Sequence, residues 1–226
     1  MVKALLTITI GNEYQEIAQL THPGLSAYAR QIGADFISLN TSDGAAPYLQ
    51  KFRIADFLDI YERILFMDSD IVITDHCPDV FALVATDAFG AWFPNPMIPG
   101  RFADQIARAQ AELGDIAWTQ NYFNSGVMVV SRAHRPIFES AKSYIEFARP
   151  QNYFDQTLLN YLVQRNRCPT IDLGFRWNHT AVAEKQDRFQ SHFIHYAGGG
   201  RVPGLRRADH IRRDLRTLGR FPSASS

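Results

Sequence analysis

Cysteine is scarce in this sequence, which holds only Cys77 and Cys168 among its 226 residues. The two lie far apart and match no paired spacing, so neither a disulfide framework nor a structural zinc site is expected. Long apolar runs are also missing, and no stretch approaches the roughly 20 residues that a membrane-spanning helix needs. The apolar run at the N-terminus is broken by Thr7 and Thr9, which is not typical of a signal peptide. We therefore expect a cytoplasmic protein, either free or peripheral at the inner face of a membrane.

Net charge is absent as well, because 23 lysines and arginines balance 23 aspartates and glutamates. This balance gives no reason to expect nucleic acid as a partner. The charges are unevenly placed, however, since residues 201–226 hold seven arginines against two aspartates. The arginines within 206–220 are spaced as in a basic helix, which predicts either a solvated terminal helix or a weak contact with anionic lipid or an anionic acceptor. The sequence shows no internal repeat and indicates no oligomeric state.

Hydrophobic residues make up 46% of the chain, enough for a sizeable core without disulfides. We expect one domain over residues 1–220 and a disordered tail over 221–226. Apolar strands alternate with amphipathic helices, which predicts an α/β fold with a mostly parallel central sheet and flanking helices. The expected strands cover 3–10, 35–39, 64–67, 127–130 and 193–196. The expected helices cover 13–31 with a break or kink at 22–24, then 52–61, 102–113, 137–148, and a segment around 158–162.

Two aspartates stand at the end of the most apolar predicted strand. Residues 64–67 (Ile-Leu-Phe-Met) run directly into Asp68, Ser69 and Asp70. In an extended chain the i, i+2 spacing points the side chains of Asp68 and Asp70 to the same side. Carboxylates so close repel each other, and beside a buried strand this is costly unless a cation lies between them. The pattern indicates a site for the divalent cation that a diphosphate leaving group needs, with a polar turn at the strand end as the other interpretation.

A phosphatase of the haloacid dehalogenase class is an alternative interpretation of the same residues. Its nucleophilic aspartate also follows a buried strand, in an Asp-x-Asp-x-Thr/Val pattern that Asp68, Asp70 and Val72 match. The sequence contains no Asp-Asp or Gly-Asp-x-x-x-Asp segment downstream to hold the magnesium of that class. The motif also lies unusually far from the N-terminus, so this alternative is the weaker one.

Four motifs of the chain follow one another in the order found in a known family. They are Tyr-Glu-Arg-Ile-Leu-Phe-Met-Asp-Ser-Asp at 61–70, Tyr-Phe-Asn-Ser-Gly-Val-Met-Val-Val at 122–130, Phe-Asp-Gln-Thr-Leu-Leu-Asn at 154–160, and His-Tyr-Ala-Gly-Gly-Gly-Arg at 195–201. Together they resemble the motifs of the GT-A glycosyltransferases of retaining family 8, which are galactosyl- and glucosyltransferases that act with manganese. The resemblance extends from residue 3 to about residue 201 and implies a GT-A nucleotide-diphospho-sugar transferase fold.

The resemblance implies a metal site that is completed from the far end of the chain. In the family pattern Asp68, Asp70 and His195 ligate the ion, and two carboxylates with one imidazole suit Mn²⁺, with Mg²⁺ as the alternative. Arg201 stands where the family has a lysine, and it would pair with the phosphates as the donor breaks. The Pro-Trp that follows in the family is Val-Pro here, so the loop over the diphosphate differs.

Further positions are implied to contact the nucleotide-sugar donor. Lys51 matches a basic donor-binding position, although a solvated lysine is its other interpretation. Thr7, Thr9 and Tyr14 approximate the nucleoside contacts near the carboxyl end of the first strand, where open α/β sheets bind nucleotides. The acidic residues that the family has after this strand are absent, so uridine is preferred only through the resemblance. The other implied donor-binding residues are Asp68, Ser69, Asn124, Ser125 and Gly198. For Asn124, satisfying a backbone turn is the alternative role.

Asp155 and Gln156 are the expected catalytic residues. Both are predicted at the start of a helix, whose partial positive charge favours anionic or hydroxyl-rich ligands. The resemblance assigns Asp155 to hydroxyls of the donor sugar and Gln156 to the space beneath the anomeric carbon. It also implies a retaining transfer, in which the acceptor hydroxyl attacks the face that the diphosphate leaves and the leaving phosphate is the base.

We therefore expect a metal-dependent glycosyltransferase that moves a hexose from a nucleotide-diphosphate sugar, by preference a UDP-sugar, to a glycan or glycolipid acceptor. A sugar-nucleotide-binding module without catalysis would keep the same motifs and bind its ligand without turnover. A sugar nucleotidyltransferase shares the fold class, but its glycine-rich, lysine-bearing phosphate loop is missing after the first strand.

Overall fold

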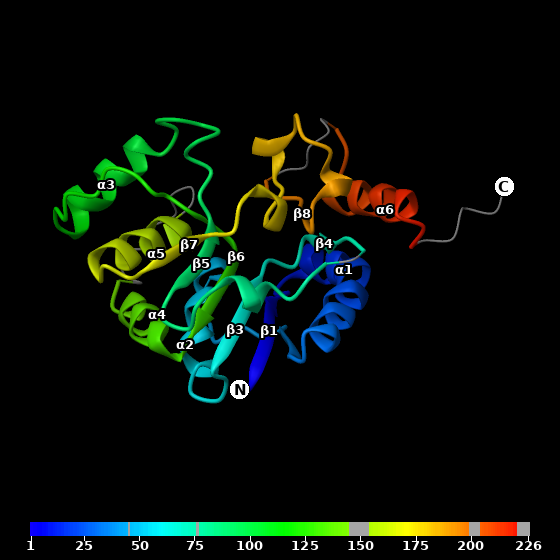
Figure 1. Cartoon of the computed structure of the whole chain (residues 1–226), viewed down its shortest axis with the longest axis horizontal. Coiled ribbons are helices and arrows are strands. Elements are labelled where there is room, and N and C mark those ends of the chain that lie inside the picture. The colour runs from blue at the N-terminus through cyan, green and yellow to red at the C-terminus, as the bar shows by residue number, and fades with distance from the viewer. Residues whose placement is uncertain (45, 76, 145–153, 199–203, 221–226) are drawn as a thin grey trace.

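A computed structural model of the chain describes residues 1–44, 46–75, 77–144, 154–198 and 204–220. Its centre is a six-stranded sheet with the order β2-β1-β3-β6-β5-β7 (Figure 1). β1 is parallel to both β2 and β3, and β5 is parallel to β7, whereas β6 is antiparallel to both of its neighbours. The mostly parallel α/β fold is thus confirmed, with β6 as the reversed strand. The strands are β1 Lys3–Ile8, β2 Asp35–Leu39, β3 Arg63–Met67, β5 Phe89–Trp92, β6 Asn124–Ser131 and β7 Thr170–Asp172.

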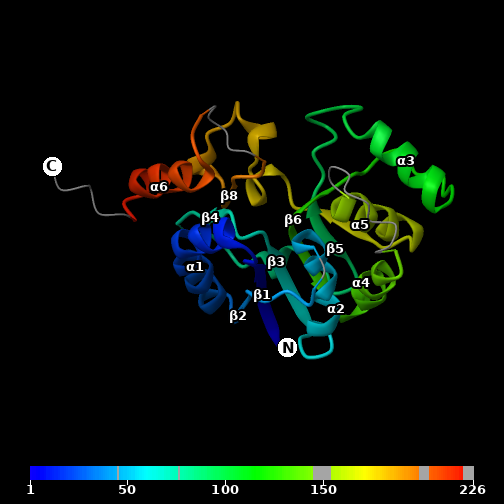
Figure 2. The ribbon, with the colours of Figure 1, turned by 180° about the vertical axis from the view of Figure 1, so that it is seen from behind.

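Both faces of the central strands are covered by helices and loops, which is why these strands read as continuous apolar runs. Because side chains alternate along a strand, Leu6 and Phe66 pack on one face while Leu5 and Leu65 pack on the other. The first face carries α2, α4 and α5, and the second carries α1 (Figures 1 and 2). The helices are α1 Asn12–Gln31, α2 Ile54–Phe57, α3 Ala103–Leu113, α4 Arg135–Lys142, α5 Phe154–Arg165 and α6 Arg207–Thr217.

The first helix runs through the residues where a break or kink was expected. α1 continues from Asn12 to Gln31 with Pro23 inside it, so the predicted break is wrong. Proline removes one backbone hydrogen bond from a helix interior. The helix nevertheless continues because one of its faces packs against the sheet and α6, and this face includes Ile17, Leu25 and Tyr28. Tertiary packing here outweighs the local preference.

The segment expected as a helix over 52–61 forms a shorter and mixed element. A 3₁₀ helix, η1 (Pro47–Arg53), leads into the four-residue α2, which ends at Phe57. The backbone N–H groups of Ile60 and Tyr61 both donate to the Phe57 carbonyl, so the chain turns there and enters β3. The expected strand 3–10 is likewise shorter, as β1 ends at Ile8. In the helix expected over 137–148, residues 145–148 lie outside the described residues.

Strands β4 (Ile71–Ile73) and β8 (Phe193–His195) form a separate two-stranded antiparallel sheet. Ile71 is paired directly with His195, so this small sheet brings the C-terminal histidine beside the segment that follows β3. In Figure 1 both strands lie beyond the upper end of β1 and β3, next to α6. This sheet therefore links the two distant parts of the chain that the sequence predicts to share a site.

Three further findings bear on the predictions made from composition. Cys77 and Cys168 are both free thiols, as expected. No helix among the described residues is long and apolar enough to cross a lipid bilayer. Residues 221–226, expected to form a disordered tail, lie outside the described residues, and the single domain over 1–220 stays a prediction.

Candidate metal and donor site

A cavity of about 470 Å³ opens where β3 ends, between β6, the start of α5 and the small β4–β8 sheet. It brings together side chains from the first, middle and last parts of the chain. Most of the site residues expected from the sequence line it. They are Tyr14, Lys51, Asp68, Ser69, Asp70, Asn124, Ser125, Asp155, Gln156, His195 and Gly198.

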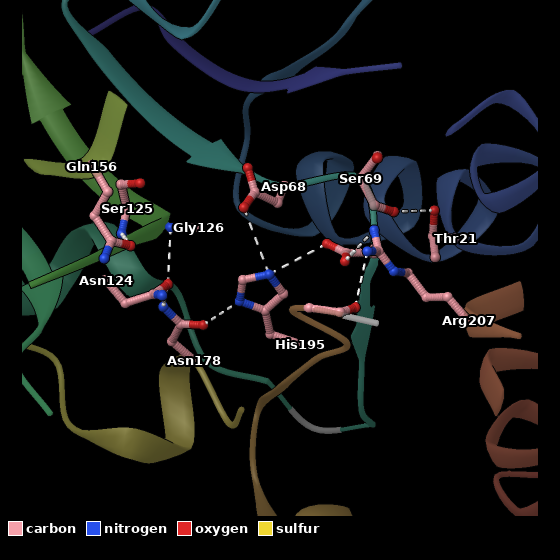
Figure 3. A network of polar contacts seen from close by, with 12 residues as sticks. Thr21, Asp68, Ser69, Asn124, Ser125, Gly126, Gln156, Asn178, His195 and Arg207 are labelled. Atoms are coloured by element: carbon pink, nitrogen blue, oxygen red, sulfur yellow. Dashed lines mark hydrogen bonds and ion pairs between the residues drawn. The ribbon is translucent and has the colours of Figure 1, made fainter. Parts of the chain in front are cut away.

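Asp68, Asp70 and His195 converge within this cavity. Figure 3 shows Asp68 beside the ring of His195. Nε2 of His195 lies 3.3 Å from Oδ1 of Asp70 and 3.6 Å from Oδ2 of Asp68. One ligand atom from each residue falls within 4.8 Å of the other two, a spacing that suits a shared metal ion. His195 and Asp70 are buried, while a third of the Asp68 side chain is exposed to the cavity. The three residues thus form a candidate metal centre that is open on one side.

Backbone contacts hold the Asp-Ser-Asp segment in place. The N–H of Asp68 donates to the Gly126 carbonyl of β6 at 2.8 Å, and the N–H of Tyr196 donates to the Asp70 carbonyl at 3.0 Å. From α1, the buried hydroxyl of Thr21 donates to the carbonyl of Ser69 at 2.7 Å. The segment is therefore fixed from three elements, and Thr21 is a positioning residue that sequence patterns gave no reason to single out.

Gly126 lets the histidine approach strand β6 closely. A Cβ atom added to Gly126 would overlap Cε1 of His195 and would lie 2.8 Å from its Nδ1 and 2.9 Å from Oδ2 of Asp68. Ordinary carbon contacts begin at about 3.5 Å. Only glycine therefore leaves space for His195 and Asp68 to meet at this point of the strand.

The two aspartates of the centre have opposite pKa shifts. For Asp68, removal of water raises the pKa of the carboxyl group, and the attraction of Lys51 and His195 only partly offsets this. For Asp70, burial also raises the pKa, but His195 and Arg207 outweigh it and the net pKa is lowered. Neighbouring positive charge thus decides which carboxylate is the more stable anion.

Lys51 is buried and connects three parts of the site. Its Nζ lies 2.9 Å from Oδ2 of Asp155 and 3.5 Å from Oδ1 of Asp68, and it donates to Oγ of Ser125 at 3.0 Å. The same atom lies 5.1 Å from the centre of the Phe66 ring. Burial lowers the pKa of Lys51, but the carboxylates of Asp155 and Asp68 outweigh it and the net pKa is raised. Lys51 therefore remains charged, and the solvated-lysine interpretation is wrong.

The start of α5 contributes Asp155 and Gln156. Oε1 of Gln156 accepts a hydrogen bond from the backbone N–H of Ser125 at 3.0 Å, which fixes the amide of this buried side chain beside β6. Asp155 is held by Lys51. Both expected catalytic residues thus border the same cavity as the candidate metal centre.

Arg207, at the start of α6, is a cavity residue that sequence reasoning missed. Its Nη1 lies 3.1 Å from Oδ2 of Asp70, and its Nη2 donates to the Gly198 carbonyl at 2.9 Å. The guanidinium also lies 5.9 Å from the centre of the Tyr14 ring. Only 15% of the side chain is exposed. It was missed because it lies in an arginine-rich helix, and nothing in the spacing distinguishes it from the arginines that face outward.

Three expected donor-binding residues are placed differently or not described. Thr7 and Thr9 are buried, and Oγ1 of Thr9 is hydrogen bonded to Oγ of Ser38 at 2.9 Å. From this part of the chain, the cavity is lined by Ile8 and Ile10. Side chains alternate along an extended chain, so Thr7 and Thr9 point the other way. Arg201 lies outside the described residues.

The basic helix α6 is anchored by carboxylates. The buried Asp214 accepts two hydrogen bonds from Arg188 at 2.7 and 2.8 Å and one from Tyr196 at 2.7 Å. Burial raises the pKa of Asp214, but these partners outweigh it and the net pKa is lowered. Arg212 pairs with Glu16 of α1 at 2.7 Å. These contacts fix α6 to the rest of the fold, and Arg212 is committed to Glu16 as Arg207 is to Asp70. A contact of α6 with anionic lipid stays a prediction.

Comparison with known proteins identifies the class. Residues 28–201 match the family model described as Glycosyl transferase family 8, so the chain belongs to this family. No curated protein is significantly similar to the sequence. The family and the fold therefore confirm a glycosyltransferase and leave its substrates open.

Several solved glycosyltransferases share the fold. One is involved in the glycosylation of the major capsid of PBCV-1, with 15% identity and a TM-score of 0.67 over 94% of this chain and 100% of that one. Another is the galactosyltransferase LgtC, solved with donor and acceptor sugar analogs, with 14% identity and a TM-score of 0.67 over 99% and 98%. GlyE of Streptococcus pneumoniae TIGR4 has 14% identity and a TM-score of 0.56, over 100% of this chain and 66% of that one. At such identities these similarities show the GT-A fold alone.

Proposed function

We propose that the protein transfers a hexose from a UDP-sugar to a glycan or lipid-linked acceptor, with a divalent cation and with retention of the anomeric configuration. The observation that carries the proposal is the convergence of Asp68, Asp70 and His195 at the edge of one cavity that Lys51, Asp155 and Gln156 also border. The cavity volume of about 470 Å³ lies within the range of small-molecule sites. LgtC, which shares the fold, was solved with donor and acceptor sugar analogs, and this supports the substrate class.

The donor set of the metal centre suits Mn²⁺, with Mg²⁺ as the alternative. Two carboxylates and one imidazole within 4.8 Å provide three ligand atoms from one side and leave the cavity side for diphosphate oxygens. A bound ion would supply Lewis-acid stabilisation of the charge on the leaving diphosphate. Asp68 and Asp70 repel each other at this distance, so the residues themselves favour an added cation.

The remaining cavity residues divide between the diphosphate and the sugar. Arg207 lies next to Asp70 and would pair with phosphate oxygens, as was expected of Arg201. Asp155, neutralised by Lys51, would accept hydrogen bonds from sugar hydroxyls. The amide of Gln156 is a poor nucleophile, so a covalent intermediate on it is not expected.

The bond changes of the proposed transfer balance without a base from the protein. The bond from the anomeric carbon to the diphosphate oxygen breaks, and the bond from the acceptor oxygen to the same carbon forms on the same face. The acceptor proton passes to the leaving phosphate. The protein's contribution is then orientation and charge stabilisation.

The first test is thermal unfolding with a panel of UDP-, GDP- and ADP-sugars, with and without Mn²⁺. A donor at 100 times its Kd adds about 2.7 kcal/mol of stability, which for a domain of this size raises Tm by roughly 5–10 °C. The wild type should show this shift with one nucleotide and only with metal, and Asp70→Ala should abolish it. Asp56→Ala is the matched control, because Asp56 is exposed and pairs with Lys142 away from the cavity.

Two outcomes of this unfolding test would overturn parts of the proposal. An equal shift without metal would remove the role of the Asp68–Asp70–His195 centre, and no shift with any nucleotide sugar would remove the donor class. Donor turnover and NMR of the product anomer then separate a transferase from a binding module. An inverted product would overturn the retaining mechanism.

A further inference from the structure

The imidazole ring of His195 has a neighbour on the side away from the aspartates. Its Nδ1 lies 2.7 Å from Oδ1 of Asn178. Asn178 comes from the segment after β7 and is fully buried, so water does not compete for this contact. The ring is thus held between Asn178 on one side and the aspartates on the other. Figure 3 shows the contacts of the ring with Asn178 and Asp68.

The orientation of the Asn178 amide follows from a chain of contacts that starts at the backbone. The N–H of Gly126 donates to Asn124 at 3.0 Å, and because an N–H only donates, the atom that accepts is Oδ1. The same Oδ1 lies 2.8 Å from Asn178, so Asn178 must present its Nδ2 there and donate. Its Oδ1 is then the atom that faces His195.

This chain of contacts determines which nitrogen of the neutral imidazole carries the proton. An amide oxygen only accepts, so Nδ1 of His195 must donate and carries the hydrogen. In the neutral ring Nε2 is therefore unprotonated and faces Asp68 and Asp70, which is the form that a metal ion requires. The protonated ring, whose positive charge lowers the pKa of Asp70, carries hydrogen on both nitrogens. The opposite tautomer would place two acceptors, Nδ1 and the amide oxygen, 2.7 Å apart.

We infer that Asn178 is a positioning residue that sets His195 in the Nδ1–H tautomer, through an amide relay that runs from the Gly126 backbone by way of Asn124. The relay thus leaves Nε2 of the neutral ring unprotonated, as a metal ligand must be, before any ion binds. The inference rests on the proposed function only in taking His195 as a metal ligand. The tautomer is a property of the protein alone and is measured without donor, acceptor or metal.

The direct test is NMR of the ring nitrogens in ¹⁵N-histidine-labelled protein, kept metal-free with chelator and at alkaline pH so that the rings are neutral. Comparison with His195→Gln assigns the signals of His195 among the seven histidines. The wild type should show the Nδ1–H pattern. Asn178→Leu, which removes the acceptor, should lose this preference. Asn178→Asp cannot donate to Asn124 but keeps an acceptor toward the ring, so it should retain the Nδ1–H pattern.

Asn160→Leu is the matched control for loss of a buried asparagine. Asn160 is also fully buried and makes hydrogen bonds to Phe123 and Gln156, but it does not contact His195. Its variant should keep the Nδ1–H pattern. If Asn178→Leu fails to fold, the wild-type spectrum and Asn178→Asp still decide, because an Nε2–H signal in the wild type overturns the inference.

A second readout is the affinity for Mn²⁺ alone, measured by calorimetry. Partners that orient a metal-binding histidine typically contribute 10- to 100-fold in metal affinity. Asn178→Leu should therefore weaken Mn²⁺ binding by about this factor, and Asn178→Asp should preserve it. An unchanged tautomer in Asn178→Leu overturns the relay. A changed tautomer with unchanged Mn²⁺ affinity overturns His195 as a ligand and, with it, the proposed metal centre.

Discussion

Replacing Gly126 by alanine should destroy the candidate metal centre through one added methyl group. The new Cβ would lie 2.9 Å from Oδ2 of Asp68 and would overlap Cε1 of His195. To restore an ordinary contact, Asp68 must retreat by about 0.5 Å and His195 by more. Metal sites tolerate deviations of about 0.2 Å in their ligand distances. The substitution therefore separates ligand atoms beyond what one ion can bridge.

The expected loss is about 100-fold in Mn²⁺ affinity, equivalent to about 2.7 kcal/mol. Overpacking of this kind also costs roughly 1–3 kcal/mol of folding stability, so stability has to be measured alongside. Calorimetric titration with Mn²⁺ gives the first quantity and urea denaturation without metal gives the second.

Gly90→Ala is the matched control for this substitution. Gly90 lies in β5, next to β6, and a Cβ there would lie 2.6 Å from the Val84 side chain and 3.2 Å from Cβ of Val129. The crowding is comparable, but none of these neighbours belongs to the metal centre. Gly90→Ala should lower stability and leave Mn²⁺ affinity unchanged. Equal Mn²⁺ affinities for Gly126→Ala and the wild type would refute the reasoning.

Three further substitutions separate the roles of charge in the site. Lys51→Met leaves Asp68 and Asp155 without their buried cation, so urea denaturation should show a loss of about 3 kcal/mol, part of which Mn²⁺ restores. A loss that metal does not reduce would contradict this role. Arg207→Gln removes the cation that competes with a metal ion for Asp70, so Mn²⁺ alone should bind more tightly. UDP in the presence of Mn²⁺ should bind about tenfold more weakly, because the partner of its phosphates is lost. If the affinities for Mn²⁺ and for UDP changed in the same direction, this role of Arg207 would be contradicted. Asp214→Asn should lower stability by about 3 kcal/mol at neutral pH. Because the folded pKa of Asp214 is lowered, its contribution is complete above the unfolded pKa of about 3.9 and is lost as the pH falls toward the folded value. If the difference in unfolding free energy between wild type and Asp214→Asn did not shrink below that pH, the lowered pKa of Asp214 would be refuted.

The sequence predicts the centre of this molecule better than its edges. The apolar run before Asp68 forms β3 at the middle of the sheet, and the carboxylates follow it as expected. The strands β5 and β7 were not predicted, because neither shows alternating polar and apolar residues or a long apolar run. β7 consists only of Thr170–Asp172, at the edge of the sheet. Short strands of this kind exist because a neighbour pairs with them, and that information is not local.

The same distinction holds within the site. Asp68, Asp70 and His195 were predictable because their residue types and order match a family pattern. Asn178 and Arg207 were not, because their roles depend on contacts between segments that only folding brings together. Thr7 and Thr9 show the converse, since a position near the end of the right strand does not determine which side chains face the cavity.

The pairing of Ile71 with His195 also determines when during synthesis the protein becomes able to hold an ion. Asp68 and Asp70 leave the ribosome early, yet the third ligand reaches them only after β8 has been made and has paired with β4. A nascent chain folds from its N-terminus as it emerges, so an ion that needs all three ligands would not bind early in folding. An ion held by all three ligands would instead join the two ends of the fold late, and a chain released before residue 195 would lack one ligand of the candidate centre.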